Sequence, residues 1–154
     1  MKAEEVMKRE VRCVYPRDKV LKVVNLFSET GFSGFPVVRE EDGVLVGVIS
    51  ESDVLRDMAR VVEGRHDVTE ELVGGMIWEI IDELDPRRFD EVVVEEIMTR
   101  DVLTVSPDTD VFAVADIMAA NNVNRIPVVD GDRKVVGIIT RGDLIAAMAR
   151  RMVP

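Results

Sequence analysis

The chain has 154 residues, of which 47% are apolar and 5% aromatic, and its formal net charge is -10. This length accommodates one ordinary domain or two small ones with a packed core. The acidic charge argues against binding to nucleic acid or anionic lipid, and no apolar run reaches the ~18 residues that cross a bilayer.

The chain contains one cysteine and one histidine, which excludes sites that need several of these side chains. Cys13 alone cannot form an internal disulfide, and a zinc site of Cys and His ligands is excluded. The apolar neighbours of Cys13 predict a buried, unreactive thiol. His66 lies in a polar run typical of an exposed loop. The N-terminal residues lack the apolar stretch of a signal peptide. We therefore expect a cytoplasmic protein with no catalytic residues and no metal site.

The first part of the chain predicts a strand-helix-strand-strand-helix unit after a short helical turn at 3–7. An apolar strand is expected at 11–14, before a turn at Pro16. Spacing of i, i+3, i+4 and i+7 then predicts a helix, with its apolar stripe formed by Val20, Val23, Val24 and Phe27. Two strands, at 35–38 and 45–49, flank an acidic turn with Gly43, and a closing helix is expected at 52–60.

A different pattern occupies residues 61–93, which we interpret as a linker. Six apolar side chains recur at helical spacing and predict an amphipathic helix over about 69–84, stopped by Asp85-Pro86. They are Val73, Met76, Ile77, Ile80, Ile81 and Leu84. We favour a linker helix packed on the module over a docking surface for a partner.

Residues 94–154 repeat the first unit. They predict a helical turn at 95–98, strands at 102–105, 126–129 and 135–139, and a closing helix at 142–152. Laying residues 4–38 on 95–129 gives 12 identities in 35 positions: Glu4, Glu5, Met7, Arg9, Val11, Val14, Pro16, Val20, Val23, Pro36, Val37 and Val38. Duplication explains this match, so the predicted organisation is repeat 1 (1–60), linker (61–93) and repeat 2 (94–154).

The predicted fold class is α/β, with two pseudo-symmetric β-α-β-β-α repeats. A unit of about 55 residues is too small to bury one face of its sheet alone. Packing of the two repeats sheet to sheet, about a pseudo-twofold axis, would bury both faces.

The two copies agree best where the last strand meets the closing helix. Ser50 and Asp53 in the first copy correspond to Thr140 and Asp143 in the second, an S/T-x-x-D pattern. This pattern caps helices by satisfying free backbone N–H groups. A helix N-terminus also suits a phosphate, and a carboxylate accepts hydrogen bonds from the two hydroxyls of a ribose. Both interpretations remain open.

These features together resemble the cystathionine-β-synthase (CBS) domain, and two in tandem resemble a CBS pair, or Bateman module. The resemblance rests on Phe35-Pro36-Val37-Val38, Ile126-Pro127-Val128-Val129 and the two S/T-x-x-D segments. It implies a regulatory module that binds AMP, ADP, ATP or S-adenosylmethionine in the cleft between its repeats. It assigns the ribose to the S/T-x-x-D residues, and the adenine pocket to Pro36, Pro127, Cys13, Val14, Thr104 and Val105. It also implies a homodimer and a separate target protein.

The copies differ in charge at the predicted site. The second has Arg125 before its Ile-Pro pair and Arg141 within its S/T-x-x-D segment, where the first has Gly34 and Glu51. Arginine forms charge-assisted hydrogen bonds with phosphate. We therefore expect the second repeat to hold the phosphates more tightly.

Two other functions remain open. The chain could be a ligand-free structural or dimerisation module whose S/T-x-x-D segments are only caps. It could also be a small enzyme that uses Asp53 and Asp143 as an acid/base pair, although duplicated carboxylates suit two ligands better than one bond. The homodimer is further predicted from apolar residues on the closing helices, which would form a surface: Val54, Met58, Ile145 and Met148.

Overall fold

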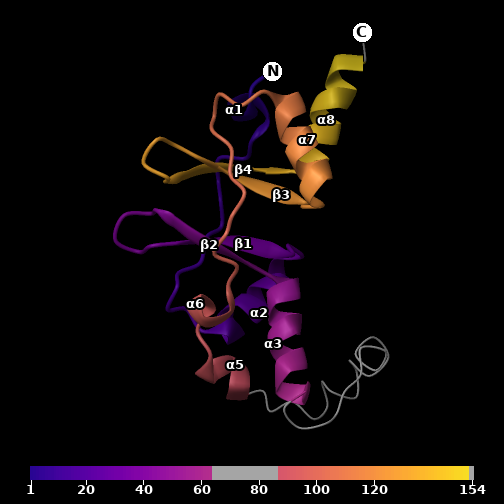
Figure 1. The fold of residues 1–154 in the computed structure, drawn as a ribbon. Coiled ribbons are helices and arrows are strands. Elements are labelled where there is room, and N and C mark those ends of the chain that lie inside the picture. Colours follow the sequence, from indigo (N-terminus) through magenta and orange to yellow (C-terminus); the bar gives the residue numbers. More distant parts are fainter. Residues whose placement is uncertain (64–86, 153–154) are drawn as a thin grey trace. The chain divides into compact units, whose positions relative to one another are not determined.

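The computed structural model of the chain describes residues 1–63 and 87–152 (Figure 1). It confirms the α/β class, with β1 beside β2 in one two-stranded sheet and β3 beside β4 in another. The predicted helix at 69–84 lies outside the described residues. The elements in chain order are α1 (Ala3–Val6), α2 (Val20–Thr30), β1 (Gly34–Val38), β2 (Leu45–Ser50), α3 (Glu51–Glu63), α5 (Arg87–Glu91), α6 (Val94–Ile97), α7 (Val111–Asn121), β3 (Arg125–Val129), β4 (Val135–Thr140) and α8 (Arg141–Met152).

The predicted first strands, at 11–14 and 102–105, are wrong in length. Only Val14 and Val105 pair, each through one parallel bridge, to Val37 and Val128 respectively. Val105 N donates to Pro127 O at 3.2 Å and Val129 N donates to Val105 O at 2.9 Å. The next bond of this parallel ladder would need an N–H from Pro127, which proline lacks. The proline of the strand motif therefore blocks extension of each pairing toward the rest of the predicted strand.

Helix α5 was not predicted, because its five residues contain a single apolar side chain and no periodicity. The predicted stripe of α2 is confirmed for Val20 and Val23, while Val24 and Phe27 are only partly buried. In α2 the buried residues are Val20, Val23 and Leu26, while Gly31 ends the helix in the left-handed region at φ 71°. The matching end of α7 is Asn122, at φ 51°. Asparagine is among the few residues that adopt this conformation readily.

The described chain groups into two compact units that do not coincide with the predicted repeat bounds. One, here the Asp143 unit, comprises Met1–Cys13, Val38–Val46 and Asp101–Pro154. The other, here the Asp53 unit, comprises Val14–Val37 and Gly47–Arg100. The leading segment of each repeat thus belongs to the unit that carries the S/T-x-x-D segment of the other repeat.

Burial of apolar side chains explains this exchange in the Asp143 unit. Ala3 and Val6 of α1 are buried in one cluster with residues of α7, β3, β4 and α8. Lys8 then pairs with Ile138 of β4 through two backbone hydrogen bonds, of 2.9 and 3.0 Å. Gly137, beside this pairing, has no Cβ and leaves room for the side chain of Met7.

In the Asp53 unit the second repeat supplies the leading segment, and the first repeat supplies the strands and the closing helix. Thr99, which follows α6, pairs with Val48 of β2 through two backbone hydrogen bonds of 2.9 Å. A Cβ on Gly47 would lie 2.6 Å from Met98 Sδ and 2.9 Å from Thr99 O. Such distances are too short for carbon, so glycine is needed there. The rings of Phe27 and Phe35 stack in the same unit, with centroids 5.4 Å apart.

No helix among the described residues combines the length and apolar character needed to cross a membrane.

Candidate functional site

The two S/T-x-x-D segments lie where the last strand of each unit enters its closing helix. Asp53 Oδ2 accepts hydrogen bonds from Ser50 N at 2.8 Å and from Ser50 Oγ at 3.0 Å. Asp143 Oδ2 accepts the equivalent bonds from Thr140 N and Oγ1, both at 2.9 Å. One oxygen of each carboxylate therefore orders the strand-to-helix turn, and the capping interpretation holds in both copies. A ligand would have to use the other oxygen.

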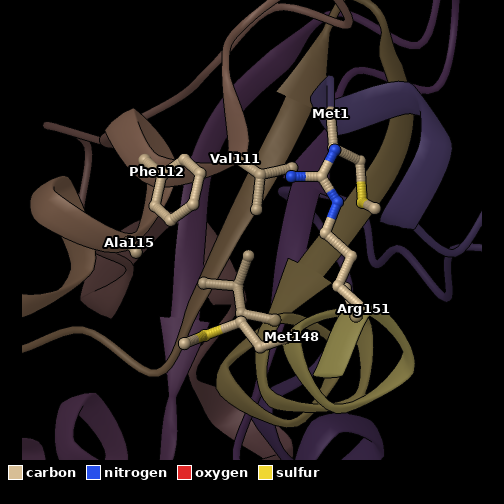
Figure 2. A pocket seen from close by; sticks show the side chains of 8 residues that line it. Met1, Val111, Phe112, Ala115, Met148 and Arg151 are labelled. Atoms are coloured by element: carbon tan, nitrogen blue, oxygen red, sulfur yellow. The ribbon is translucent and has the colours of Figure 1, made fainter. Parts of the chain in front are cut away.

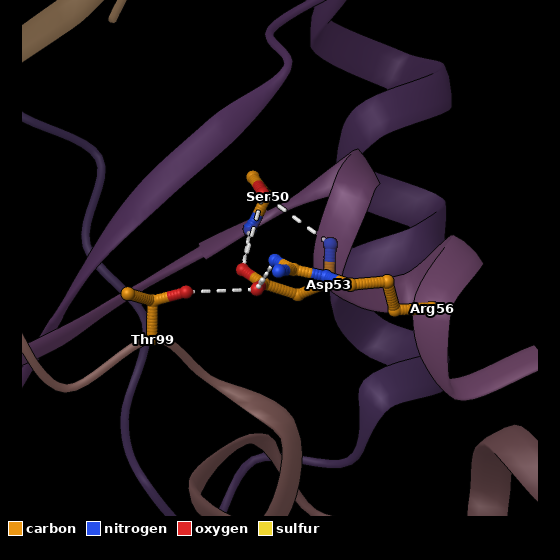
Figure 3. Close-up of polar contacts among 4 residues, drawn as sticks. All are labelled: Ser50, Asp53, Arg56 and Thr99. Atoms are coloured by element: carbon orange, nitrogen blue, oxygen red, sulfur yellow. Dashed lines mark hydrogen bonds and ion pairs between the residues drawn. The ribbon is translucent and has the colours of Figure 1, made fainter. Parts of the chain in front are cut away.

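The second carboxylate oxygen has different surroundings in the two units. Asp53 Oδ1 accepts a hydrogen bond of 2.6 Å from Arg56 Nη2 and one of 2.8 Å from Thr99 Oγ1 (Figure 3). Asp143 Oδ1 accepts no hydrogen bond from any described residue, and its ion-pair partner is Lys8, with Nζ at 3.5 Å. The side chain of Asp53 is 4% exposed and that of Asp143 is 13% exposed. The two predicted sites are therefore alike in backbone and unlike in accessibility.

Sequence reasoning missed Lys8, Thr99 and Arg56. Lys8 and Thr99 occupy the same position of the duplicated leading segment, since residues 4–38 align with 95–129. The alignment contained the correspondence, but only the exchange of leading segments brings these side chains to the aspartates. Arg56 lies three residues after Asp53 on α3, a spacing that places two helical side chains on one face. Its counterpart on α8 is Ala146.

The predicted phosphate arginines occupy separate positions in the Asp143 unit. Arg125 begins β3 and lies opposite Thr140 in the register. Arg141 begins α8, and its guanidinium donates to Val123 O at 3.3 Å and to Asn122 Oδ1 at 3.2 Å. These bonds hold Arg141 against the C-terminal end of α7. In this conformation its guanidinium stabilises the connection from α7 to β3.

The residues predicted to line an adenine pocket fall into two groups. Val14, Pro36, Val105 and Pro127 are buried. Thr104 is partly exposed, and with Val105 it lines a groove of about 600 Å³ whose other walls are Ser106, Pro107, Asp108, Thr109, Ile117, Val129, Asp130 and Gly131. Thr140 and Asp143 are not among its walls. Because Val105 pairs with Val128 and Thr140 with Arg125, the groove and the aspartate lie toward opposite ends of β3.

Cys13 is partly buried and packs against a cluster of Val38, Leu45 and Val129. Burial raises the pKa of its thiol above the ordinary value. The thiol therefore stays protonated at neutral pH, whereas a nucleophilic cysteine reacts as the thiolate.

Apolar side chains lie at the surface of α7 and α8. Two of them, Phe112 and Met148, line the pocket shown in Figure 2, whose walls also include Met1 and Arg151. Ile145 is 65% exposed and Met148 is 47% exposed, and Phe112 on α7 is also exposed. On α3 the prediction is wrong for Val54, which is buried, while Leu55 is exposed. Val54 follows Asp53 on the inner face of its helix, so the exposed apolar position falls one residue later.

Among the described residues, no group of three or more Asp, Glu, His or Cys side chains is placed to bind a metal ion.

Comparison with known proteins assigns both repeats to one family. The family model described as CBS domain matches residues 3–60 and 94–150. The chain is 34% identical over 157 residues to the uncharacterized protein MJ1426 of Methanocaldococcus jannaschii, covering 96% of this chain and 91% of that protein. It is 31% identical to inosine-5'-monophosphate dehydrogenase of the same organism, covering 94% of this chain but 23% of the enzyme.

A solved structure of similar fold carries a ligand. The crystal structure of CBSX2 from Arabidopsis thaliana in complex with AMP superposes with a TM-score of 0.73 at 25% sequence identity. The match covers 97% of each chain.

Proposed function

Because this chain belongs to the CBS-domain family and both of its repeats match the family model, we propose that it is a regulatory module that binds an adenosyl ligand and catalyses no reaction. The ligand is AMP, ADP, ATP or S-adenosylmethionine. The AMP complex of CBSX2 supports an adenine nucleotide. The match to a small share of inosine-5'-monophosphate dehydrogenase supports a module that accompanies catalytic machinery rather than forming it.

One observation carries the proposal. Asp143 has one carboxylate oxygen that orders the turn and a second whose partner is the ammonium of Lys8, in an ion pair of 3.5 Å. A ribose presents two neighbouring hydroxyls, and a carboxylate oxygen has lone pairs to accept from them. The ammonium of Lys8, 3.5 Å from this oxygen and largely exposed, places positive charge beside it, which favours a ligand that carries phosphate.

The environment of Asp53 argues against the alternative of a small enzyme. A general acid or base must exchange its proton with a substrate at hydrogen-bond distance. The four hydrogen bonds that Asp53 accepts from Ser50, Arg56 and Thr99 occupy both of its oxygens. Such a carboxylate is a structural acceptor, and the acid/base pair is left without one member.

A homodimer and a separate target protein complete the proposal. The exposed apolar residues Phe112, Ile145 and Met148 lie on two helices that pack together within the Asp143 unit (Figure 1). Surfaces of this kind mark protein interfaces more often than exposed single residues do. We assign this surface to a second copy of the chain.

Thermal unfolding with and without ligand tests the function. A ligand at ~100-fold its dissociation constant stabilises the fold by about 2.7 kcal/mol, which for a chain of this size raises Tm by roughly 5–10 °C. GMP serves as the control for the base. Absence of a shift with AMP, ADP, ATP and S-adenosylmethionine at millimolar concentration would leave the ligand-free structural module as the better interpretation. Mass spectrometry of the ligand that co-purifies identifies which adenosyl compound is bound.

A further inference from the structure

We propose that the chain binds one adenosyl ligand, at Asp143, and that Arg56 and Thr99 close the equivalent position at Asp53. This inference rests on the proposed function, because it concerns where the ligand binds. It departs from the symmetry of the sequence, in which both aspartates belong to the same pattern.

The two carboxylates differ in the hydrogen-bond capacity that remains free. A carboxylate has two oxygens with about four acceptor positions in total. Asp53 accepts four hydrogen bonds within the chain: two from Ser50 on Oδ2, and one each from Arg56 and Thr99 on Oδ1 (Figure 3). These four bonds occupy the acceptor positions of Asp53. A ribose could bind Asp53 only after displacing a charged donor and a hydroxyl from a side chain that is almost fully buried.

The chain itself holds Thr99 and Arg56 beside Asp53. Thr99 is fixed through its backbone, because its N–H and C=O both pair with Val48 at 2.9 Å. Its hydroxyl is therefore held beside Asp53. Arg56 lies on the same helix as Asp53. Its side chain is 65% exposed, so it is held by its contact with Asp53, a charge-assisted bond of 2.6 Å that is shorter than the common range for such pairs. Neither donor requires a ligand to bring it into place.

Both donors are missing at Asp143. The counterpart of Arg56 is Ala146, which has no polar side-chain atom. The counterpart of Thr99 is Lys8, whose backbone is fixed by the same pairing, to Ile138. Its ammonium lies 3.5 Å from Asp143 Oδ1 without a hydrogen bond, on a largely exposed side chain. Lys8 and Arg56 are equally exposed, at 64% and 65%, so the difference lies in the contact: 3.5 Å without a hydrogen bond for Lys8 against a hydrogen bond of 2.6 Å for Arg56. Lys8 can therefore turn toward a ligand and leave the oxygen to the ribose.

Calorimetric titration with AMP tests this asymmetry, because it reports the number of ligands per chain. The wild-type chain should bind one AMP. Asp143→Ala should abolish binding, and Asp53→Ala should leave one site with affinity unchanged within about threefold. Two AMP per wild-type chain, or loss of the single site in Asp53→Ala, would overturn the proposal. No binding of any adenosyl ligand to the wild-type chain would instead refute the proposed function.

Exchange of the donors between the units tests their role directly. Arg56→Ala with Thr99→Lys should open Asp53 and raise the stoichiometry to two, while Arg150→Ala, a change at an exposed arginine of α8, should leave it at one. If the opened variant does not fold, the reverse exchange decides. Lys8→Thr with Ala146→Arg should close Asp143 and weaken the binding of adenosine, which has no phosphate for Lys8 to contact, at least tenfold. Lys8→Thr with Ala146→Gln is the uncharged control. Unchanged adenosine affinity in the closed variant would show that these donors do not decide occupancy.

Discussion

Thr99 donates a hydrogen bond of 2.8 Å to Asp53, a residue 46 positions earlier in the chain. Asp53 belongs to the S/T-x-x-D segment of the first repeat, and Thr99 to the leading segment of the second. Each repeat therefore supplies the residue that faces the aspartate of the other, since Lys8 stands in the same relation to Asp143. A threonine in one place and a lysine in the other give two copies of one motif different chemistry.

The different partners predict different contributions to stability. Asp53→Ala removes an acceptor that serves the turn, Arg56 and Thr99, and we expect a loss of about 2–4 kcal/mol in the free energy of unfolding. Asp143→Ala removes the turn acceptor and a 3.5 Å ion pair, and should cost about 1–2 kcal/mol. Urea unfolding of both variants without ligand measures the difference. Equal losses would contradict the hydrogen bonds described for Asp53.

The close approach of Thr99 to β2 predicts a strict requirement for glycine. A Cβ at Gly47 would lie 2.9 Å from Thr99 O, a backbone atom that the paired strand holds in place. Gly47→Ala should therefore lower the free energy of unfolding by about 1–3 kcal/mol. Gly131→Ala is the matched control, because nothing lies within 4 Å of its added Cβ. A Gly47→Ala variant as stable as Gly131→Ala would show that the leading segment is not held against β2.

The apolar surface on α7 and α8 predicts the oligomeric state. Light scattering should give twice the chain mass of 17.2 kDa at micromolar concentration. The double change Ile145→Glu with Met148→Glu should yield a monomer, because two charges would be buried without partners. Leu103→Glu, at another exposed apolar residue, should stay dimeric. A wild-type monomer, or equal dissociation of all variants, would remove the assignment of this surface.

Lys8 predicts how the site distinguishes ligands by charge. Lys8→Met keeps the aliphatic stem and removes the ammonium that lies beside Asp143. Since a hydrogen bond to a charged group contributes about 1.5–3 kcal/mol, the affinity for ATP should fall tenfold or more. The affinity for adenosine, which has no phosphate, should change little. Thr99→Val is the control at the equivalent position, and an equal loss for adenosine and ATP would assign Lys8 to packing or to the ribose instead.

The helices and strands of each repeat could be predicted from the sequence because their causes are local. The apolar stripe of Val20 and Val23 marked α2, and the turn at Gly43 marked the hairpin of β1 and β2. The duplication and the equivalent positions of Asp53 and Asp143 could also be identified from the sequence alone. The first strands were overestimated, because the missing N–H of Pro36 and Pro127 matters only once the pairing partner is known.

Tertiary structure decided which residues surround each aspartate. A buried leading segment exchanged between the units brings Lys8 to Asp143 and Thr99 to Asp53, across separations that no local pattern encodes. The sequence suggested Arg141 as a phosphate ligand from its position beside Thr140, but the end of α7 lies within reach and binds its guanidinium. Hydrogen-bond capacity depends on distance and direction in space. The alignment therefore identified two equivalent carboxylates, and only the fold decided which of them keeps an oxygen that accepts no hydrogen bond from the described residues.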